Sequence, residues 1–232
     1  SLKEAYTQTV RAFNLAERFM TPVFLLLDET LGHMQAKAVL PEISDLKIER
    51  RAEFKGSPKD YEPYDAAPDK PAVLNPFFRG YHYHITGLHH GAKGFPTENE
   101  QIVDRSIKRL FNKISTHEDE IVQYEEFMLD DAEICIIAYG SVSLAAKDAI
   151  LKLRGQGVRV GLFRPITLWP SPAHKLRELG ERFNKILIAE LNLGQYLLEV
   201  QRACLRDDFK TLLKANGRPI SPSEIIEKVK EL

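Results

Sequence analysis

The sequence predicts an α/β fold built on a parallel sheet, and two observations in the C-terminal part carry this prediction. Three apolar runs of strand length lie at 134–139, 158–163 and 185–190. Segments with helical spacing of apolar residues separate them, at 144–154 and 173–183. Such alternation is typical of βαβ units, whose parallel strands are buried on both faces. We therefore expect a three-layer domain.

Composition excludes several classes of protein. The chain has 232 residues and a formal net charge of −1, so no strong attraction to nucleic acid or to an anionic membrane is expected. No apolar run approaches the length of a membrane-spanning helix, and no signal peptide is visible. The two cysteines, Cys135 and Cys204, lie far apart in apolar segments, which fits reduced thiols of a cytoplasmic protein. They are too few for a four-cysteine iron–sulfur site.

The N-terminal segment predicts one helix followed by one strand. Apolar residues recur with helical spacing over 2–20, and Val23–Leu27 has the pattern of a buried parallel strand. Asp28 and Glu29 follow that strand, where they either face a ligand or cap the next turn. We expect 1–42 to be the last αβ unit of a domain whose other strands lie upstream of Ser1.

Residues 43–97 predict an extended arm that packs on other protein surface. The segment is rich in prolines and has no regular period, yet its aromatic residues argue against free disorder. His82, His84, His89 and His90 are either metal ligands or hydrogen-bonded loop histidines, and a metal analysis of the purified chain distinguishes the two.

A helix is predicted from Thr97, as capping residue, to Ile114, and a further helical turn over Ile121–Met128. The basic face of the first helix is either a nucleic-acid surface or a solvated face, and the acids that follow it favour the second. This face consists of Arg105, Lys108, Arg109 and Lys113.

Beyond the third apolar run, the pattern predicts three more elements. These are a helix over 194–205, an edge strand over 209–213 and a final helix that starts at Ser221 with a proline in its first turn.

Candidate site residues lie where the predicted parallel strands end. Gly140 and Ser141 either expose helix N–H groups to an anion or precede a helix that Ser141 or Ser143 caps. The turn lacks the further glycines of a dinucleotide fingerprint. Arg164 either holds a carboxylate or phosphate or pairs with an acid at an interface, and Asn192 ends the third run. All four lie at the edge where α/β sheets bind ligands.

An ordered series of motifs runs along nearly the whole chain. They are Phe19-Met20-Thr21-Pro22-Val23, Leu25-Leu26-Leu27-Asp28-Glu29, His84-Ile85-Thr86-Gly87-Leu88-His89-His90, Tyr139-Gly140-Ser141, Leu162-Phe163-Arg164-Pro165-Ile166-Thr167-Leu168-Trp169-Pro170 and Glu190-Leu191-Asn192-Leu193-Gly194-Gln195. In this order and spacing they resemble the C-terminal part of the α subunit of 2-oxoacid:ferredoxin oxidoreductases, of the 2-oxoglutarate type in particular.

The resemblance implies three segments. Residues 1–42 would end a pyrimidine-binding domain, 43–130 would form a linker arm with a helix, and 131–232 would form a transketolase C-terminal-like α/β domain. The domain at 131–232 would mainly supply subunit contacts, so Gly140, Ser141, Arg164 and Asn192 would face either a cofactor or a partner subunit.

The resemblance also implies a cytoplasmic hetero-oligomer that uses thiamine diphosphate. A β subunit would hold the diphosphate site, the magnesium ion and an iron–sulfur cluster, with ferredoxin and coenzyme A as further partners of the complex. The reaction would decarboxylate a 2-oxoacid oxidatively, form an acyl-CoA and reduce ferredoxin. The cofactor-activating glutamate of such enzymes would lie upstream of Ser1, so no catalytic residue is assigned here, and this chain alone would be inactive.

Two alternatives remain open from the residues. One is a self-contained module that binds a nucleotide at Gly140-Ser141 or acts as a scaffold. The other is the corresponding subunit of a lipoate-linked 2-oxoacid dehydrogenase or of transketolase. Thermal shifts with nucleotides test the first, and the neighbouring genes test the second.

Overall fold

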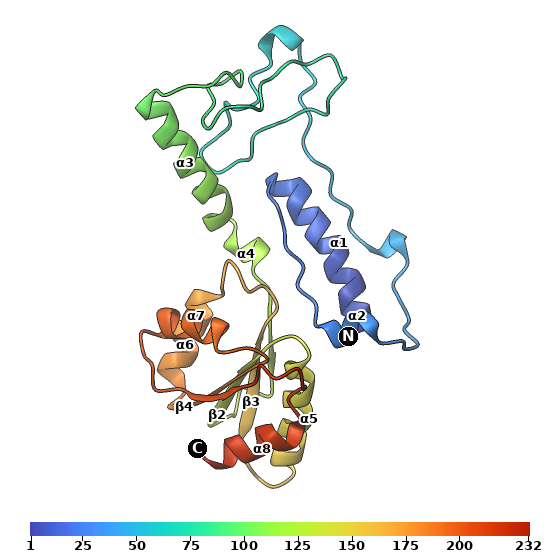
Figure 1. Cartoon of the computed structure of the whole chain (residues 1–232), viewed down its shortest axis with the longest axis vertical. Helices are drawn as coiled ribbons and strands as arrows, with labels where there is room; N and C mark the ends of the chain where they lie inside the picture. The colour runs from blue at the N-terminus through green and yellow to red at the C-terminus, as the bar shows by residue number, and fades with distance from the viewer. The chain divides into compact units, whose positions relative to one another are not determined.

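A computed structural model describes residues 1–232. Contacts within the chain divide it into two compact units (Figure 1). The first comprises residues 1–27 and 34–121, and the second comprises residues 28–33 and 122–232. We describe each unit by itself.

The second unit contains a five-stranded sheet with strand order β1-β3-β2-β4-β5. β2, β3, β4 and β5 pair in parallel, and β1 pairs antiparallel with β3 at the edge. The predicted parallel sheet is confirmed, with one antiparallel strand added. The strands are β1 (Tyr124–Phe127), β2 (Ile134–Ala138), β3 (Val160–Pro165), β4 (Lys185–Glu190) and β5 (Lys210–Leu213).

Helices cover both faces of this sheet, as a three-layer domain requires. α5 and α8 lie on one face, and α6 and α7 on the other (Figure 1). Alternate residues of β2 point to opposite faces: Ile136 packs with the α5 side, and Ile137 packs with the α6 side. The helices are α5 (Val142–Arg154), α6 (Ala173–Arg182), α7 (Gln195–Cys204) and α8 (Pro222–Lys230).

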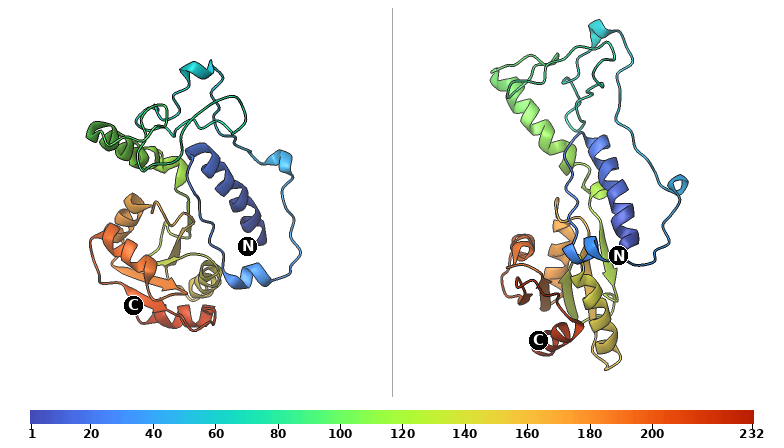
Figure 2. Two further views of the ribbon diagram at one scale, coloured as in Figure 1. Left: turned by 45° about the horizontal axis from the view of Figure 1, so that its top comes forward. Right: turned by 45° about the vertical axis from the view of Figure 1, so that its right-hand side comes forward.

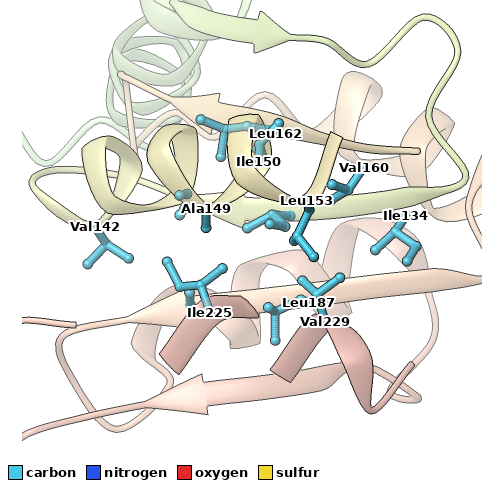
Figure 3. Close-up of a cluster of buried hydrophobic side chains, with 14 of the residues drawn as sticks. Ile134, Val142, Ala149, Ile150, Leu153, Val160, Leu162, Leu187, Ile225 and Val229 are labelled. Atoms are coloured by element: carbon cyan, nitrogen blue, oxygen red, sulfur yellow. The ribbon is translucent and has the colours of Figure 1, made fainter. Parts of the chain in front are cut away.

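The α5–α8 face has an aliphatic core. Ile150 and Leu153 of α5 meet Leu187 of β4 and Ile225 and Val229 of α8 (Figure 3). Ile150, Leu153, Leu187 and Ile225 are fully buried, so this cluster holds both helices on the sheet through apolar burial.

The predicted helical turn at Ile121–Met128 is wrong. Its central residues form strand β1, in which Glu125 is opposite Arg164 and Glu126 is opposite Phe163. Exposure alternates along β1, and the Tyr124 ring contacts the Phe163 ring at 5.2 Å. A four-residue segment is too short to separate a period of two from a helical period.

The first unit contains α1 (Leu2–Phe19), α3 (Glu100–Ser115) and α4 (Glu118–Ile121). The predicted N-terminal helix is confirmed as α1. Ser1 and Glu4 form a capping box at its start, so the first helical residue is Leu2. The short α2 (Glu29–His33) belongs to the second unit. No helix of the chain has the length and apolar character needed to cross a membrane.

The predicted buried strand at Val23–Leu27 is not formed. The segment has no strand beside it to supply hydrogen bonds, and a single strand cannot satisfy its own backbone. Its apolar side chains are therefore exposed, with Phe24 at 86% and Leu26 at 76%.

The arm over 43–97 makes hydrogen bonds between its own residues, and its packing on another protein surface stays a prediction. Two 3₁₀ turns, Ile43–Asp45 and Pro58–Asp60, are its only helical elements, and Figure 2 shows the rest as irregular coil. Buried Asn75 exchanges hydrogen bonds with both backbone groups of Phe54, at 2.7 and 2.9 Å. The hydroxyls of Tyr61 and Tyr83 join the same hydrogen-bond network, through bonds with the backbone of residues 73 and 75.

The helix α3 differs from its prediction at two points. Asn99, not Thr97, caps it, because the Asn99 Oδ1 accepts from the Ile102 amide at 3.1 Å. The predicted basic face of α3 is only partly exposed to solvent. Arg109 and Lys113 are the buried residues of this helix, while Leu110 is 51% exposed.

Candidate functional site

The carboxyl edge of the parallel strands gathers the predicted site residues. Gly140 follows β2, Arg164 lies near the end of β3, and Asn192 follows β4. Because the three strands are parallel, these positions share one edge of the sheet, as the sequence predicts.

The start of α5 is closed by a carboxylate from this chain. Asp28 Oδ2 accepts a hydrogen bond from the Ser141 amide at 2.6 Å. A negative charge at a helix N-terminus is stabilising, so Asp28 takes the position that an external anion would take. The predicted caps are wrong, since Ser141 makes no side-chain cap and the Ser143 hydroxyl donates to the Gly140 carbonyl at 2.7 Å.

Gly140 makes the approach of Asp28 possible. Its φ is +57°, in the left-handed region that favours glycine. A Cβ atom here would lie 2.8 Å from Asp28 Oδ2, closer than such atoms approach. The backbone conformation therefore favours glycine at this position, and the missing side chain leaves room for the Asp28 carboxylate.

The start of α7 is closed in the same manner by Glu190, which is 1% exposed. Its Oε2 accepts from the Tyr196 amide at 2.9 Å, and its Oε1 accepts from the Leu197 amide at 2.8 Å. The Tyr139 hydroxyl donates to Glu190 Oε2 at 2.9 Å. These bonds offset the cost of burying the carboxylate.

Asn192 completes this closure. Its Oδ1 accepts from the amides of Gly194 at 2.7 Å and Gln195 at 2.9 Å. Its Nδ2 donates to the Tyr139 hydroxyl at 2.9 Å, which links the ends of β2 and β4. The four successive amides from 194 to 197 therefore all donate to side chains of this chain.

The electrostatics of the edge follow from these contacts. Burial, and then the charge of Glu190, raise the pKa of Tyr139 above its ordinary value. Burial also raises the pKa of the neighbouring Tyr196. The two rings meet edge to face at 5.4 Å, and both phenols remain protonated at neutral pH. Only the Tyr139 hydroxyl donates a hydrogen bond, to Glu190.

Arg164 pairs inside its own chain. Its Nη1 lies 3.1 Å from Glu125 Oε2 on β1, and Lys147 of α5 pairs with the other oxygen of Glu125. This acid belongs to the same chain, and whether Arg164 also meets a ligand or a partner subunit stays a prediction. The hydrogen bonds from these cations, which outweigh burial, hold the pKa of Glu125 below its ordinary value.

The histidines of the arm make separate contacts. The His84 ring lies 4.6 Å from the Phe95 ring, and the His90 ring stacks on Tyr64 at 4.5 Å. No group of three or more His, Cys, Asp or Glu side chains in the chain is arranged to hold a metal ion.

Tyr139 and Glu190 lie in the motifs of the sequence but are not among the predicted site residues, and the role of Asp28 is open from the sequence. The available signal is position: Asp28 and Glu190 are acids that follow or end an apolar run. That pattern does not distinguish an acid that serves a ligand from one that closes a helix, because both need a carboxylate at a helix start.

Comparison with known proteins finds a family match in each of the two parts of the chain. Residues 1–109 match the family described as pyruvate flavodoxin/ferredoxin oxidoreductase, thiamine diP-bdg, and residues 132–225 match pyruvate:ferredoxin oxidoreductase core domain II. The chain is 37% identical to the 2-oxoglutarate synthase subunit KorA of Methanothermobacter marburgensis, over 99% of this chain and 61% of that relative. The resemblance to the α subunits of 2-oxoacid:ferredoxin oxidoreductases is confirmed.

The chain is also similar to a further relative and to a solved structure. The ketoisovalerate oxidoreductase subunit VorB of the same organism is 30% identical, over 100% of this chain and 58% of the relative. The solved 2-oxoglutarate:ferredoxin oxidoreductase from Magnetococcus marinus superposes with a TM-score of 0.89, at 26% identity, over 99% of this chain and 40% of that chain. The chain spans about three-fifths of the length of the curated relatives it matches.

The edge described above does not fit the diphosphate of thiamine diphosphate. Asp28 accepts a hydrogen bond from the Ser141 amide at the start of α5. Glu190 and Asn192 accept hydrogen bonds from the backbone amides at the start of α7. A diphosphate needs hydrogen-bond donors, and the amides of Ser141 and of residues 194–197 already donate to side chains of this chain. We therefore derive no chemical step through the cofactor from these residues.

Proposed function

We propose that this chain is part of the α subunit of a thiamine-diphosphate-dependent 2-oxoacid:ferredoxin oxidoreductase that acts on 2-oxoglutarate. The complex oxidatively decarboxylates the 2-oxoacid, transfers the acyl group to coenzyme A and passes the electrons to ferredoxin. The observation that carries the proposal is the match of 99% of the chain, at a TM-score of 0.89, to an enzyme solved with 2-oxoglutarate, coenzyme A and succinyl-CoA bound.

In this proposal a β subunit holds the diphosphate, the magnesium ion and the iron–sulfur cluster. The closed starts of α5 and α7 support it, because this part of the chain offers the diphosphate no free donor. Residues 1–42 then end the pyrimidine-binding domain, 43–130 form the linker arm, and 131–232 form the transketolase C-terminal-like domain. In this proposal the carboxyl edge of the sheet faces the partner subunit, and its fold is supported by Gly140, Ser141, Arg164 and Asn192. The complex is cytoplasmic.

The exposed segment Val23–Leu27 also supports a role within a larger assembly. Five successive apolar residues at 37 to 86% exposure have the composition of a buried strand. We propose that further strands pair with this segment in the complete subunit.

The test is an activity assay of the complete α subunit, produced together with its β subunit. We expect reduction of ferredoxin that requires both coenzyme A and 2-oxoglutarate, and slower reduction with pyruvate or 2-oxoisovalerate. Faster turnover of either competitor would overturn the substrate assignment. No ferredoxin reduction with any 2-oxoacid would overturn the proposed activity itself.

A nucleotide-binding module is the second candidate from the sequence, and Asp28 argues against it. Its carboxylate lies where a phosphate would bind at Gly140-Ser141. No thermal stabilisation by NAD, ATP or coenzyme A is expected for this chain alone.

A further inference from the structure

The first unit contains a small polar cavity that the proposed function does not use. It has a volume of about 20 Å³, enough for one water-sized group, and lies between the arm and α3. Its walls include Tyr64, His90, Ala92, Arg105, Ser106 and Arg109.

Arg109 is the unusual member of this set. It is only 8% exposed, and it makes one hydrogen bond, from Nη1 to the Lys70 carbonyl at 3.1 Å. No acid forms an ion pair with Arg109, although the exposed Asp65 lines the same cavity. A guanidinium has five N–H donors, and buried charges in proteins are normally paired.

Two further cations lie on the same side of α3. Arg105, Arg109 and Lys113 are spaced four residues apart, so they form one stripe along the helix. Lys113 is 5% exposed and donates to the Met20 carbonyl at 3.2 Å, again with no acid as partner. Burial, and then the charge of Arg109, lower the pKa of Lys113. The stripe thus carries positive charge that this chain does not neutralise.

The wall opposite Arg109 is held in place. The Tyr64 ring stacks on His90 with an angle of 16° between the rings, and the Tyr64 hydroxyl donates to the His84 carbonyl at 2.8 Å. The Tyr64 amide donates to the Ala92 carbonyl at 3.1 Å. The aromatic wall therefore forms without a ligand.

We propose that this cavity binds a carboxylate group, with Arg109 as its main ligand and Arg105 at its opening. The planar edge of a guanidinium matches the two oxygens of a carboxylate, and the cavity admits one of them. The carboxylate belongs either to a small organic acid or to an acidic side chain of a protein, and both sources share this chemistry.

The test follows the Arg109 Nε–H signal in a ¹⁵N-labelled sample of the complete chain. Acetate is titrated first, and then a short acetylated and amidated peptide of aspartate and glutamate, each against chloride at equal ionic strength. We expect a saturable shift with one of the two carboxylate ligands and none with chloride. Saturation by acetate assigns a small organic acid, and saturation by the peptide alone assigns a protein side chain.

Variants separate binding at this cavity from general attraction of anions. Binding is followed by the amide signals of the cavity wall, and Arg109→Met is expected to weaken it by at least about tenfold. Arg79→Met, which removes an exposed arginine elsewhere on the arm, is expected to leave it unchanged. Ala92→Leu fills the cavity without removing a charge, so it tests the site even if Arg109→Met fails to fold.

The proposal is overturned if neither carboxylate gives a saturable shift, since the cavity then holds only water. It is also overturned if a folded Ala92→Leu variant binds as well as the unchanged chain.

Discussion

At the scale of single residues, carboxylates of this chain occupy the positions where an α/β sheet most often binds anions. Asp28 closes α5, and Glu190 closes α7 with help from Asn192. The sequence predicts that the site residues gather at this edge, and it identifies Asp28 as an acid that follows an apolar run. It does not reveal which acid reaches which helix, because Asp28 and Ser141 are 113 positions apart.

Replacing Asp28 with alanine is expected to destabilise the second unit by about 1 kcal/mol, because the Ser141 amide loses a charged acceptor. The same change frees the start of α5 for an external anion. Thermal unfolding with and without phosphate measures both effects: phosphate should raise the Tm of Asp28→Ala more than that of the unchanged chain. Asp28→Asn is the matched control, since it keeps an acceptor oxygen. Equal phosphate stabilisation of Asp28→Ala and the unchanged chain would contradict this role of Asp28.

Glu224 gives the stability a dependence on pH. Lys214 and the capping contacts of Ser221 lower its pKa from 4.5 to about 2. A lowered folded-state pKa means that the stabilisation is present above about pH 4.5 and is lost as the pH falls toward 2. The side chain is 35% exposed, so solvent screens the pair and we expect at most about 1 kcal/mol. Chemical unfolding of the unchanged chain and Glu224→Gln should differ at pH 7 and converge near pH 2. A difference that is constant with pH would contradict this assignment.

At the scale of elements, the sequence predicts the second unit well because burial and local period agree there. β4 (Lys185–Glu190) has the predicted bounds, and α6 (Ala173–Arg182) differs from its prediction by one residue. The segment Val23–Leu27 has the same apolar composition yet forms no strand, because a strand also needs a neighbour. The strand β1 is missed by the sequence prediction for a different reason, because the exposure pattern of four half-exposed residues is too short to indicate a strand.

The core on the α5–α8 face offers an element-scale test. Leu153 is fully buried there, while Leu151 on the same helix is 56% exposed. Leu153→Ala is expected to lower the free energy of unfolding by about 3 kcal/mol, through lost burial and a cavity. Leu151→Ala should change it by less than about 0.5 kcal/mol. Denaturant titration of the two variants measures the difference, and equal losses would mean that α5 does not pack on the sheet through Leu153.

At the scale of the whole molecule, sequence motifs indicate the resemblance to 2-oxoacid:ferredoxin oxidoreductases, and the structure adds which side chains occupy the helix starts at the sheet edge. The motifs indicate this resemblance because they occur in order along both units, from Met20-Thr21-Pro22 to Glu190-Leu191-Asn192. They do not predict that the exposed Gly140-Ser141 turn is occupied by Asp28, because that contact depends on the folded arrangement.

The most direct test of this account is calorimetric titration of thiamine diphosphate with magnesium into this chain alone and into the complete α subunit assembled with its β subunit. Because Asp28, Glu190 and Asn192 fill the helix starts here, we predict no binding by the chain alone and tight, stoichiometric binding by the complex. Tight, stoichiometric binding by the chain alone would contradict the account.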